Sequence, residues 1–432
     1  MESREVYTKQ QRIAELAGRT PRFRMVSLNQ YLTLDWLREA YRLTRKSGAP
    51  GVDGITAAAY ERNLDANLAD LLERAKSGRY HAPPVRRAYI PKGHNETRPL
   101  GIPTLEDKIL QRAVVMLLNP VYEQDFLDCS YGFRPRRSPH MALDALWRQI
   151  MGMGGCWLID ADIRKFFDTL PHGALRDVLS QRVGDGVIRR LVSKWLHAGV
   201  LEDGAISFPE AGTPQGGVIS PLLSNIYLHD VLDVWFEHQI KPRLRGKAFL
   251  IRFADDFVMG FERQDDAERV MEVLPKRFGR YGLTIHPEKT RLVSFHPPQR
   301  RDDKRASFDF LGFTHYWDLS RKGRHFVRRT TRSERFTRAL QNVRAYCYAT
   351  MSRPVQEQWK GLCTRMRGHY GYYGITGNAK ALSRYRYMVG RIWWQSLNRR
   401  SGHKGKPWEW FNRRILPRYP LLPARVVHSV YA

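Results

Sequence analysis

Two short apolar runs that each contain or end in aspartates constrain this chain more than any other feature. The first is WLIDAD, residues 157–162, and the second is FLIRFADDFVMGF, residues 249–261. Because Asp favours turns, the second run predicts a hairpin that turns near Asp255. If the two runs pair in one sheet, Asp162, Asp255 and Asp256 crowd one edge. Bare carboxylates repel one another there, whereas hard divalent cations take oxygen ligands, so the pattern favours a metal-dependent site.

The charge of the chain indicates a polyanionic partner. Its 432 residues include 72 Lys and Arg against 43 Asp and Glu, a formal net charge of +29. Such an excess typically attracts nucleic acid, and the alternative is a basic surface with no specific ligand. Four scattered cysteines without a CxxC pair argue against a zinc site and against a disulfide framework. No apolar run is long enough for a signal peptide or a membrane span, so we expect an intracellular protein.

The order of local patterns predicts an α+β fold. Residues 86–92 are typical of a strand stopped by Pro91, and a loop is expected over 93–104. Residues 155–167 predict a strand that ends in acids. After about residue 325, Asp and Glu become rare, while Arg, Tyr and Trp dominate in helical patterns. Strands mixed with helices, followed by a purely helical region, indicate a sheet domain and then a helical domain.

Seven sequence blocks, the first beginning at Tyr89, follow one another in a characteristic order within a stretch from about residue 50 to 313. They are YIPKGHNETRPLGIPTLEDKILQ, YGFRPRRSPHMAL, DADIRKFFD, GTPQGGVISPLLSNIYL, IRFADDFVMGF, LTIHPEKTRLV and FLGF. In order and content they resemble the group II intron-encoded reverse transcriptase/maturase family, and RGHYGYYGITGN at 367–378 resembles its maturase, or thumb, domain. Taken alone, Asp255–Asp256 fits a plain polar turn, but these blocks decide against that. The family's core is Tyr-Ala-Asp-Asp; Phe253 replaces the Tyr, and we expect altered tuning with retained catalysis.

The resemblance implies a right-hand polymerase of the α+β class, in which fingers and a palm with an antiparallel sheet precede an α-helical thumb/maturase domain. The implied segments are 1–84, an N-terminal extension with the start of the fingers; 85–325, the fingers and palm; 326–400, the thumb/maturase domain; and 401–432, a basic segment for DNA or RNA binding. No CxxC or His-Asn-His cluster follows, so we expect no endonuclease module.

The same resemblance implies the metal ligands. Asp162 and Asp255 are the primary ligands of two Mg²⁺ ions, for which Mn²⁺ can substitute, and Asp256 lies beside them. Ile163 offers its backbone carbonyl to the metal. Asp160 is a decoy acid. Such a pair of ions catalyses nucleotidyl transfer by in-line displacement.

Other residues are implied to bind the incoming nucleotide. Lys92 and Arg98 flank a loop and clamp the triphosphate. Gln215 contacts the template–nucleotide pair, while Gly216 allows close backbone approach. Lys289 is the candidate general acid for pyrophosphate.

Phe167 occupies the position of an aromatic ring under the deoxyribose, where it clashes with a 2′-hydroxyl. Since adjacent residues on a strand face opposite ways, one of Phe166 and Phe167 is expected in the core. Arg134, Arg136 and Arg137 are expected to meet template phosphates or the single-stranded end of the template.

The expected function is RNA-directed DNA polymerisation, with intron RNA as template, a DNA primer or target, and deoxynucleotides. The protein is also expected to bind group II intron RNA, assisting splicing and retrohoming from the bacterial cytosol. One alternative is a related enzyme adapted to defence or DNA repair, and another is an RNA-binding splicing factor with little polymerase activity. A viral-type RNA-dependent RNA polymerase would need a small or polar residue at position 167. The sequence leaves the oligomeric state open.

Overall fold

The protein forms two compact units. The first comprises Met1–Ala142 and Leu158–Leu292, and the second comprises Leu143–Trp157 and Val293–Ala432. The four segments expected from the sequence, 1–84, 85–325, 326–400 and 401–432, are functional divisions. The division into two compact units does not test them, so they stay predictions. The computed structural model describes residues 2–19, 23–93, 96–202, 204–208, 211–212, 216–300, 305–320, 322–400 and 405–429.

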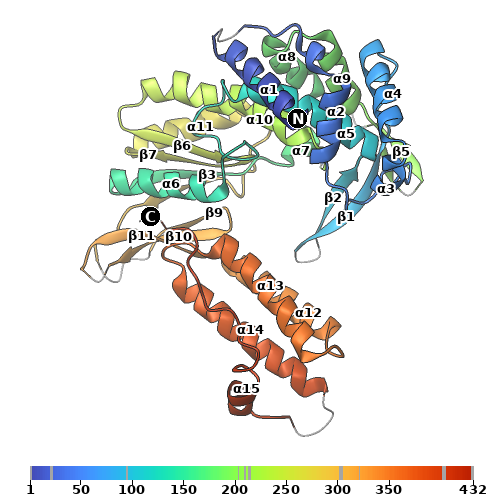
Figure 1. The fold of residues 1–432 in the computed structure, drawn as a ribbon. Coiled ribbons are helices and arrows are strands. Elements are labelled where there is room, and N and C mark those ends of the chain that lie inside the picture. Colours follow the sequence, from blue (N-terminus) through green and yellow to red (C-terminus); the bar gives the residue numbers. More distant parts are fainter. Residues whose placement is uncertain are drawn as a thin grey trace. The chain divides into compact units, whose positions relative to one another are not determined.

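Helices form most of the first unit (Figure 1). Its central helix is α5, whose residues are buried on nearly every side because α1 and α2 pack against it. Thr104 caps the start of α5 by accepting a hydrogen bond from Asp107 N at 3.2 Å. Trp36 of α2 donates its indole N–H to Ala113 O of α5 at 2.9 Å. The helices are α1 (Glu2–Arg19), α2 (Leu34–Leu43), α3 (Ala57–Glu61), α4 (Leu64–Ser77), α5 (Leu105–Tyr122), α7 (Phe166–Thr169), α8 (His172–Arg182), α9 (Gly186–Leu196), α10 (Ser220–Leu228) and α11 (Gln264–Arg280).

One sheet of this unit has the strand order β2-β1-β4-β5, formed by β1 (Val85–Gly93), β2 (Glu96–Ile102), β4 (Val200–Glu202) and β5 (Ala205–Ser207). β1 and β2 are antiparallel, and their register shifts between Pro91 and Gly93. The prediction of a loop over 93–104 is therefore wrong for β2. Pro91 did not stop the strand because it lies beside this irregularity and faces no second partner strand, which are the places where a sheet tolerates proline.

A second sheet has the order β6-β7-β3-β8, formed by β3 (Cys156–Ala161), β6 (Ala248–Phe253), β7 (Asp256–Phe261) and β8 (Arg291–Phe295). The predicted hairpin is β6–β7, with Phe253 opposite Asp256. The pairing of the two acid-bearing runs, which the metal-site hypothesis required, is also present, because β7 neighbours β3. The helix α11 covers this sheet through Phe278, whose ring stacks on Phe257 of β7 at 6.0 Å. Two π-helical stretches, His229–Val234 and Phe236–Ile240, continue α10.

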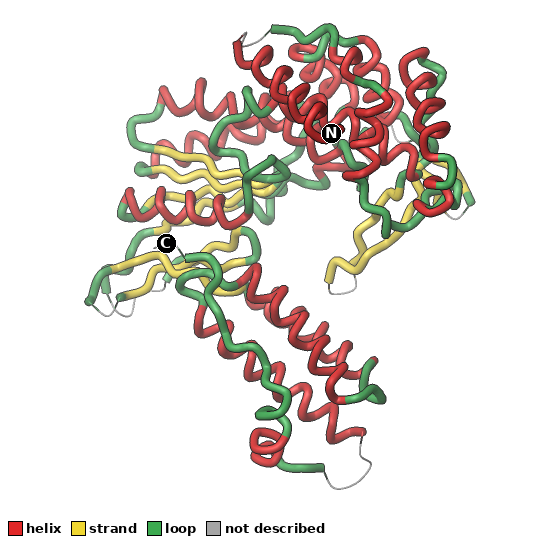
Figure 2. Tube along the Cα trace, in the orientation of Figure 1, coloured by secondary structure: helices red, strands yellow, loops and turns green. Residues whose placement is uncertain are grey.

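The second unit combines a three-stranded antiparallel sheet with a helical region (Figure 2). The sheet has the order β11-β10-β9, and Trp147 of α6 donates to Val327 O of β11 at 2.9 Å. The elements are α6 (Pro139–Met153), β9 (Ser307–Phe310), β10 (Phe313–Leu319), β11 (His325–Thr331), α12 (Ser333–Ala349), α13 (Val355–Tyr373), α14 (Ala379–Arg400) and α15 (Trp408–Arg414). The expected α+β class, with helices following the sheets, is confirmed.

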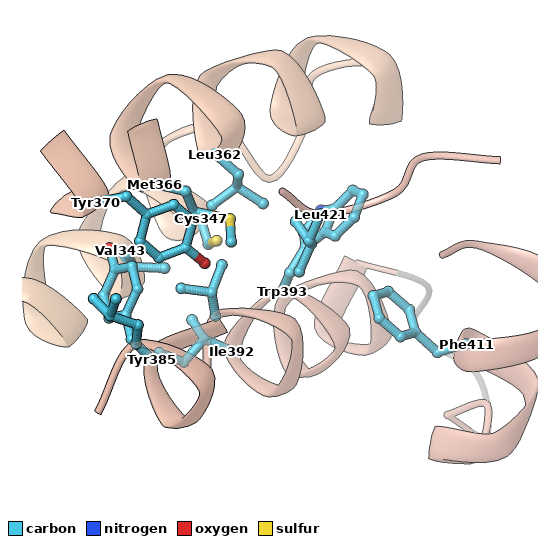
Figure 3. Packing of buried hydrophobic residues seen from close by; sticks show 12 residues of the cluster. Val343, Cys347, Leu362, Met366, Tyr370, Tyr385, Ile392, Trp393, Phe411 and Leu421 are labelled. Carbon is cyan, nitrogen blue, oxygen red and sulfur yellow. The ribbon is translucent and has the colours of Figure 1, made fainter. Parts of the chain in front are cut away.

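The helical region has its own hydrophobic core, which centres on Trp393 (Figure 3). Trp393 is completely buried and donates its indole N–H to Gln358 Oε1 at 3.0 Å. Trp394 and Trp408 pack partly buried against this core, whereas Trp410 is 40% exposed. Three of these four tryptophans thus contribute to the core of the helical region. Within the described residues, no helix combines the length and the apolar character that crossing a membrane requires.

Candidate active site

The turn between β6 and β7 presents two neighbouring carboxylates. Asp255 is half-buried and Asp256 is exposed. Ala254, which precedes them, has φ +57, in the left-handed region that costs a non-glycine residue roughly 1–2 kcal/mol. Such a conformation persists only where surrounding structure imposes it, so the neighbours of this turn explain its shape.

A glycine from a distant loop lies directly against this turn. A Cβ atom added to Gly132 would lie 2.2 Å from Ala254 N and 2.9 Å from Phe253 C, closer than any side chain tolerates. The next residue, Phe133, places its ring 6.4 Å from that of Phe253. The YGFRP block therefore buttresses the acidic turn, a role that the sequence analysis did not assign to it.

A buried arginine binds the turn to its surroundings. Arg252, the β6 residue two before Ala254, is completely buried together with Asp233. It donates from Nε and Nη2 to the two carboxylate oxygens of Asp233 at 2.7 and 2.6 Å. Its other donors reach Asn225 Oδ1 at 2.9 Å, Ala254 O at 3.0 Å and Ser130 Oγ at 2.8 Å. All five N–H groups of the guanidinium are therefore used.

This network holds both sides of the turn. Asn225 donates to Gly132 O at 2.6 Å, which fixes the glycine that packs on Ala254. The backbone of Arg252 accepts from Tyr131 N at 2.8 Å and donates to Cys129 O at 2.7 Å. Burial by itself would raise the pKa of the Asp233 carboxyl, but the charge of Arg252 outweighs it and lowers that pKa. The pair is therefore charged in the folded protein.

Sequence reasoning missed this network although one signal was visible. Arg252 is the single charged residue within the apolar run FLIRF. A charge in such a run needs a buried partner, but nothing in the spacing identifies Asp233 as that partner.

Asp162 lies immediately after β3, in a backbone that pairs with the segment leading to β8. Asp162 O accepts from His286 N at 2.8 Å, and Arg164 N donates to Thr284 O at 2.8 Å. Ile163, between them, therefore directs its own N–H and C=O away from this segment, as alternate residues of a strand do. That is the side on which β7 neighbours β3. The orientation fits the carbonyl role expected for Ile163.

A lysine pairs with the Asp162 carboxylate. Lys289 Nζ lies 3.1 Å from Asp162 Oδ2, and its side chain is 58% exposed. On the same sheet, Arg291 lies 3.3 Å from Asp160. The structure thus places Lys289, the candidate general acid, beside Asp162, the candidate metal ligand. Asp160, which was not expected to bind metal, pairs with Arg291 instead.

Asp162, Asp255, Asp256 and the Ile163 carbonyl have the chemistry that divalent cations require, although their oxygens do not converge on one point. In the described ranges, no three carboxylate, histidine or cysteine side chains are grouped closely enough to form a metal site. Asp162 instead contacts Lys289. However, three partly exposed carboxylates at the ends of neighbouring strands, with a backbone carbonyl, are the oxygen ligands that Mg²⁺ prefers.

Phe166 and Phe167 lie in a short helix instead of the predicted strand. β3 ends at Ala161, and Lys165 has φ +46, which breaks the extended run before α7. Both phenylalanines are buried, with rings 5.3 Å apart, so the expectation that strand alternation separates them is wrong. A Cβ on Gly212 would lie 2.9 Å from Phe167 O, so the start of the Gly-rich block packs on Phe167.

The residues expected to bind the nucleotide are described in part. Gly216 has φ +114 and lies so close to β2 that an added Cβ would be 2.6 Å from Gly101 O, which is the close approach that glycine permits. Gln215 lies outside the described residues. For Lys92 and Arg98 the backbone is described: Lys92 lies where the β1–β2 register shifts, and Arg98 is opposite Ile90.

A second buried network supports the Gly-rich block, and sequence reasoning missed it. Gln111 accepts from Ile219 N at 3.2 Å and donates to Asp107 Oδ2 at 3.0 Å. Asp107 also accepts from Trp195 Nε1 at 2.7 Å and from the Tyr80 hydroxyl. Burial raises the pKa of Asp107 to about 6. The signal in the sequence was that Asp107 and Gln111, four residues apart, continue the helical face that carries Val114 and Leu118.

The expectation that Arg134 meets template phosphates is wrong. Its side chain is 4% exposed and contacts Glu123 at 3.1 Å, while Nη1 donates to Leu127 O and Ser130 O. Arg137 is paired with Asp128, whose side chain is 93% exposed. Arg134 therefore stabilises the loop that carries Gly132 instead of reaching outward.

Comparisons with known proteins agree with this geometry. The family model for reverse transcriptase (RNA-dependent DNA polymerase) matches residues 90–315, just over half of the chain and the part that holds all the site residues. Protein YkfC of Escherichia coli K12 is 37% identical over 320 residues, covering 66% of this chain and 83% of that protein. Group II intron-encoded protein LtrA of Lactococcus lactis subsp. cremoris is 38% identical over 249 residues, covering 55% of this chain and 41% of LtrA. The chain thus spans well under half of LtrA.

We expect Arg252→Lys to lower the free energy of unfolding by about 2–4 kcal/mol, because lysine keeps the charge but cannot reproduce the forked contacts around a buried carboxylate. Urea unfolding of the variant and the parent protein measures this difference. The control is Arg263→Lys, whose 50% exposed side chain pairs with Asp265 at 2.9 Å and should change stability little. Equal effects of the two substitutions would contradict the role given to Arg252.

Proposed function

This chain belongs to the reverse transcriptase family of RNA-directed DNA polymerases, and we propose that Asp162, Asp255 and Asp256 carry its nucleotidyl transfer. The observation that supports this assignment is the pairing of β7 with β3, which sets the Asp255–Asp256 turn beside the strand that ends at Asp162. Enzymes of this family use divalent metal ions, and we assign Mg²⁺, for which Mn²⁺ can substitute. When bound, two such ions activate the primer 3′-hydroxyl and offset the charge of the triphosphate.

The chain's own residues hold and balance this centre. The three carboxylates and the carbonyl of Ile163 hold the ions. Lys289 lies 3.1 Å from Asp162 and supplies a proton to the departing pyrophosphate, because its exposed ammonium can exchange one carboxylate partner for a phosphate. The Arg252 network keeps the turn in one conformation, so the carboxylates need no rearrangement of the backbone when substrate arrives.

The nucleotide is bound, in this proposal, by the edge formed from β1, β2 and the Gly-rich block. Lys92 and Arg98 clamp the triphosphate, and Gln215 with Gly216 contacts the template–nucleotide pair. Support comes from Gly216: an added Cβ would lie 2.6 Å from Gly101 O, so the block lies directly against the end of β2. Phe167 excludes ribonucleotides, and it packs on the start of the same block through Gly212.

A second function follows from the relatives and from charge. We propose that the protein also binds group II intron RNA and assists its splicing and retrohoming. Several relatives are intron-encoded proteins, including the putative COX1/OXI3 intron 1 protein of Saccharomyces cerevisiae, 27% identical over 310 residues, covering 60% of this chain and 37% of that protein. The alternatives, a related enzyme in defence or DNA repair and a splicing factor with little polymerase activity, are separated from it by the next three experiments.

Asp255→Asn should lower primer extension on an RNA template, with deoxynucleotides and Mg²⁺, by roughly a thousandfold or more, since an essential ligand charge is lost. Asp160→Asn is the matched control, because Asp160 pairs with exposed Arg291 on the same sheet and its loss should change the rate by less than about threefold. Comparable loss in both variants, or unchanged extension by Asp255→Asn, would refute the ligand assignment.

Phe167→Val should lower the preference for deoxynucleotides over ribonucleotides by about 10–100-fold, because the smaller side chain leaves room for the 2′-hydroxyl. The measurement is kcat/KM for dATP and ATP in single-nucleotide extension. Since Phe167 is buried, a thermal unfolding profile close to that of the parent protein is required of the variant. A well-folded variant with unchanged sugar preference would rule out the gate.

Splicing of a cognate group II intron RNA should be faster with the protein than without it at a low Mg²⁺ concentration, because bound cationic side chains replace part of the screening that RNA folding requires. The fraction of spliced RNA over time measures this effect. The Asp255→Asn variant should assist as well as the parent protein. Identical splicing with and without protein would remove the second function and leave the first intact.

A further inference from the structure

A groove in the helical region of the second unit is not part of the site described above. Its volume is about 640 Å³, within the range of roughly 300–1,000 Å³ that is typical of small-molecule sites. Its walls come from α12, α13 and α14. Figure 1 labels these three helices. α12 contributes Asn342 together with small side chains such as Ala345 and Ala349, so this wall leaves space open.

The groove contains a pair of stacked aromatic rings. His369 of α13 stacks on Tyr385 of α14 with ring centroids 3.7 Å apart and planes at 15°. Both residues line the groove and both are buried. Burial lowers the pKa of His369 to about 4, so the imidazole is neutral at physiological pH. The two rings form an uncharged aromatic floor of the groove, of which only a small part is exposed. An uncharged ring suits this floor better than a charged group.

A cation and a third ring lie at the outer edge. The Arg365 guanidinium of α13 lies 3.6 Å from the ring centroid of Tyr346 on α12. Tyr346 packs so closely on α13 that a Cβ on Gly361 would lie 1.9 Å from its hydroxyl oxygen, so the glycine is needed for this placement. The exposed guanidinium of Arg365 offers donors to an anion.

The positive charge of the surrounding helices favours a negatively charged partner. Between residues 333 and 400 the sequence has thirteen Lys and Arg, two Glu and no Asp. Such a field attracts a polyanion and disfavours a basic or neutral protein surface. Aromatic faces beside cations are the combination by which proteins bind bases and phosphates of single-stranded nucleic acid.

We infer that this groove holds an unpaired nucleobase of a single-stranded polynucleotide, with the base against the His369–Tyr385 pair and the adjoining phosphate at Arg365. A paired base cannot enter, because both of its faces are covered within the duplex. The strand is either RNA or DNA, since the groove chemistry is common to both. This inference rests on the proposed binding of nucleic acid by the helical region and adds a defined subsite to it.

The first test compares two leucine substitutions on opposite sides of α12. Asn342→Leu narrows the groove and removes an amide, whereas Thr337→Leu replaces an exposed polar residue outside the groove. Thr337 lies five residues earlier, which at about 100° per residue turns it away from the groove. With the full-length protein and fluorescent 12-nucleotide RNA and DNA strands, Asn342→Leu should weaken binding by roughly 5–100-fold, the loss expected for one base stack. Thr337→Leu should bind as the parent protein does.

The strand whose affinity falls more in Asn342→Leu identifies the source of the base. A blunt RNA duplex of the same length should bind equally to both variants. Replacement of single bases in the strand by abasic sites should reproduce the loss in the parent protein and add nothing in Asn342→Leu. Equal binding of both single strands by the two leucine variants would overturn the inference.

The second test separates the contact that Arg365 makes in the groove from the attraction by the overall positive charge of the helices. Arg365→Gln and Arg367→Gln each remove one exposed cation from α13, but only Arg365 lines the groove. Arg365→Gln should weaken single-strand binding at least about fivefold more than Arg367→Gln. Equal losses would show that charge alone is responsible and would overturn the subsite.

Both tests use binding without deoxynucleotides, so they do not depend on catalysis. All four substituted positions are exposed, and equal thermal unfolding midpoints confirm that the variants are folded. If the protein extends primers normally but neither pair of variants differs in single-strand binding, only the groove inference is refuted. A protein that passes both tests but cannot extend primers refutes only the catalytic assignment.

Discussion

The buried ion pair of Arg252 and Asp233 is the interaction on which the catalytic edge depends. Bringing two charges into a protein interior costs several kcal/mol for each ion, and the attraction between them offsets this only when the remaining donors are also satisfied. Here every N–H of the guanidinium has an acceptor, and those acceptors come from three separated parts of the chain. The pair therefore acts less as a source of stability than as a fixed junction among these parts.

The acidic turn is shaped by this junction and by steric contact together. The carbonyl of Ala254 accepts a bond from Arg252, and Gly132 closes on the same residue from the other side. The turn is therefore held from within the sheet, while its carboxylates face outward. Asp162 is held differently, by backbone pairing with the segment before β8 and by the ammonium of Lys289. The fold alone thus fixes the position of the Asp255–Asp256 turn. The position of Asp162 depends also on the charge of Lys289, which metal ions can replace.

Local patterns were sufficient for the parts of the site that local chemistry determines. The hairpin and its turn near Asp255 followed from the apolar runs, whereas the pairing with the strand before Asp162 was only a condition of the metal-site hypothesis, which the structure meets. The partners of Arg252 did not follow, because a buried charge reveals that a partner exists but not where it lies. The helix at Phe166 was missed because a single residue, Lys165, adopts a left-handed conformation that no propensity indicates. Resemblance to the family identified the functional residues, whereas the structure explains what holds them.

The π-helical stretch that carries Asp233 gives the chain an unusual dependence on length. Each residue added to or removed from a helix rotates the residues that follow it, by about 100° in an α-helix, so the position of Asp233 relative to Arg252 depends on how many residues separate it from Asn225. Wide π turns typically accommodate one additional residue in a helix. Substitutions that keep the number of residues between Asn225 and Asp233 leave both side chains pointing toward Arg252. A single-residue deletion between Asn225 and Asp233 rotates the carboxylate away, so this segment tolerates changes of sequence far better than changes of length.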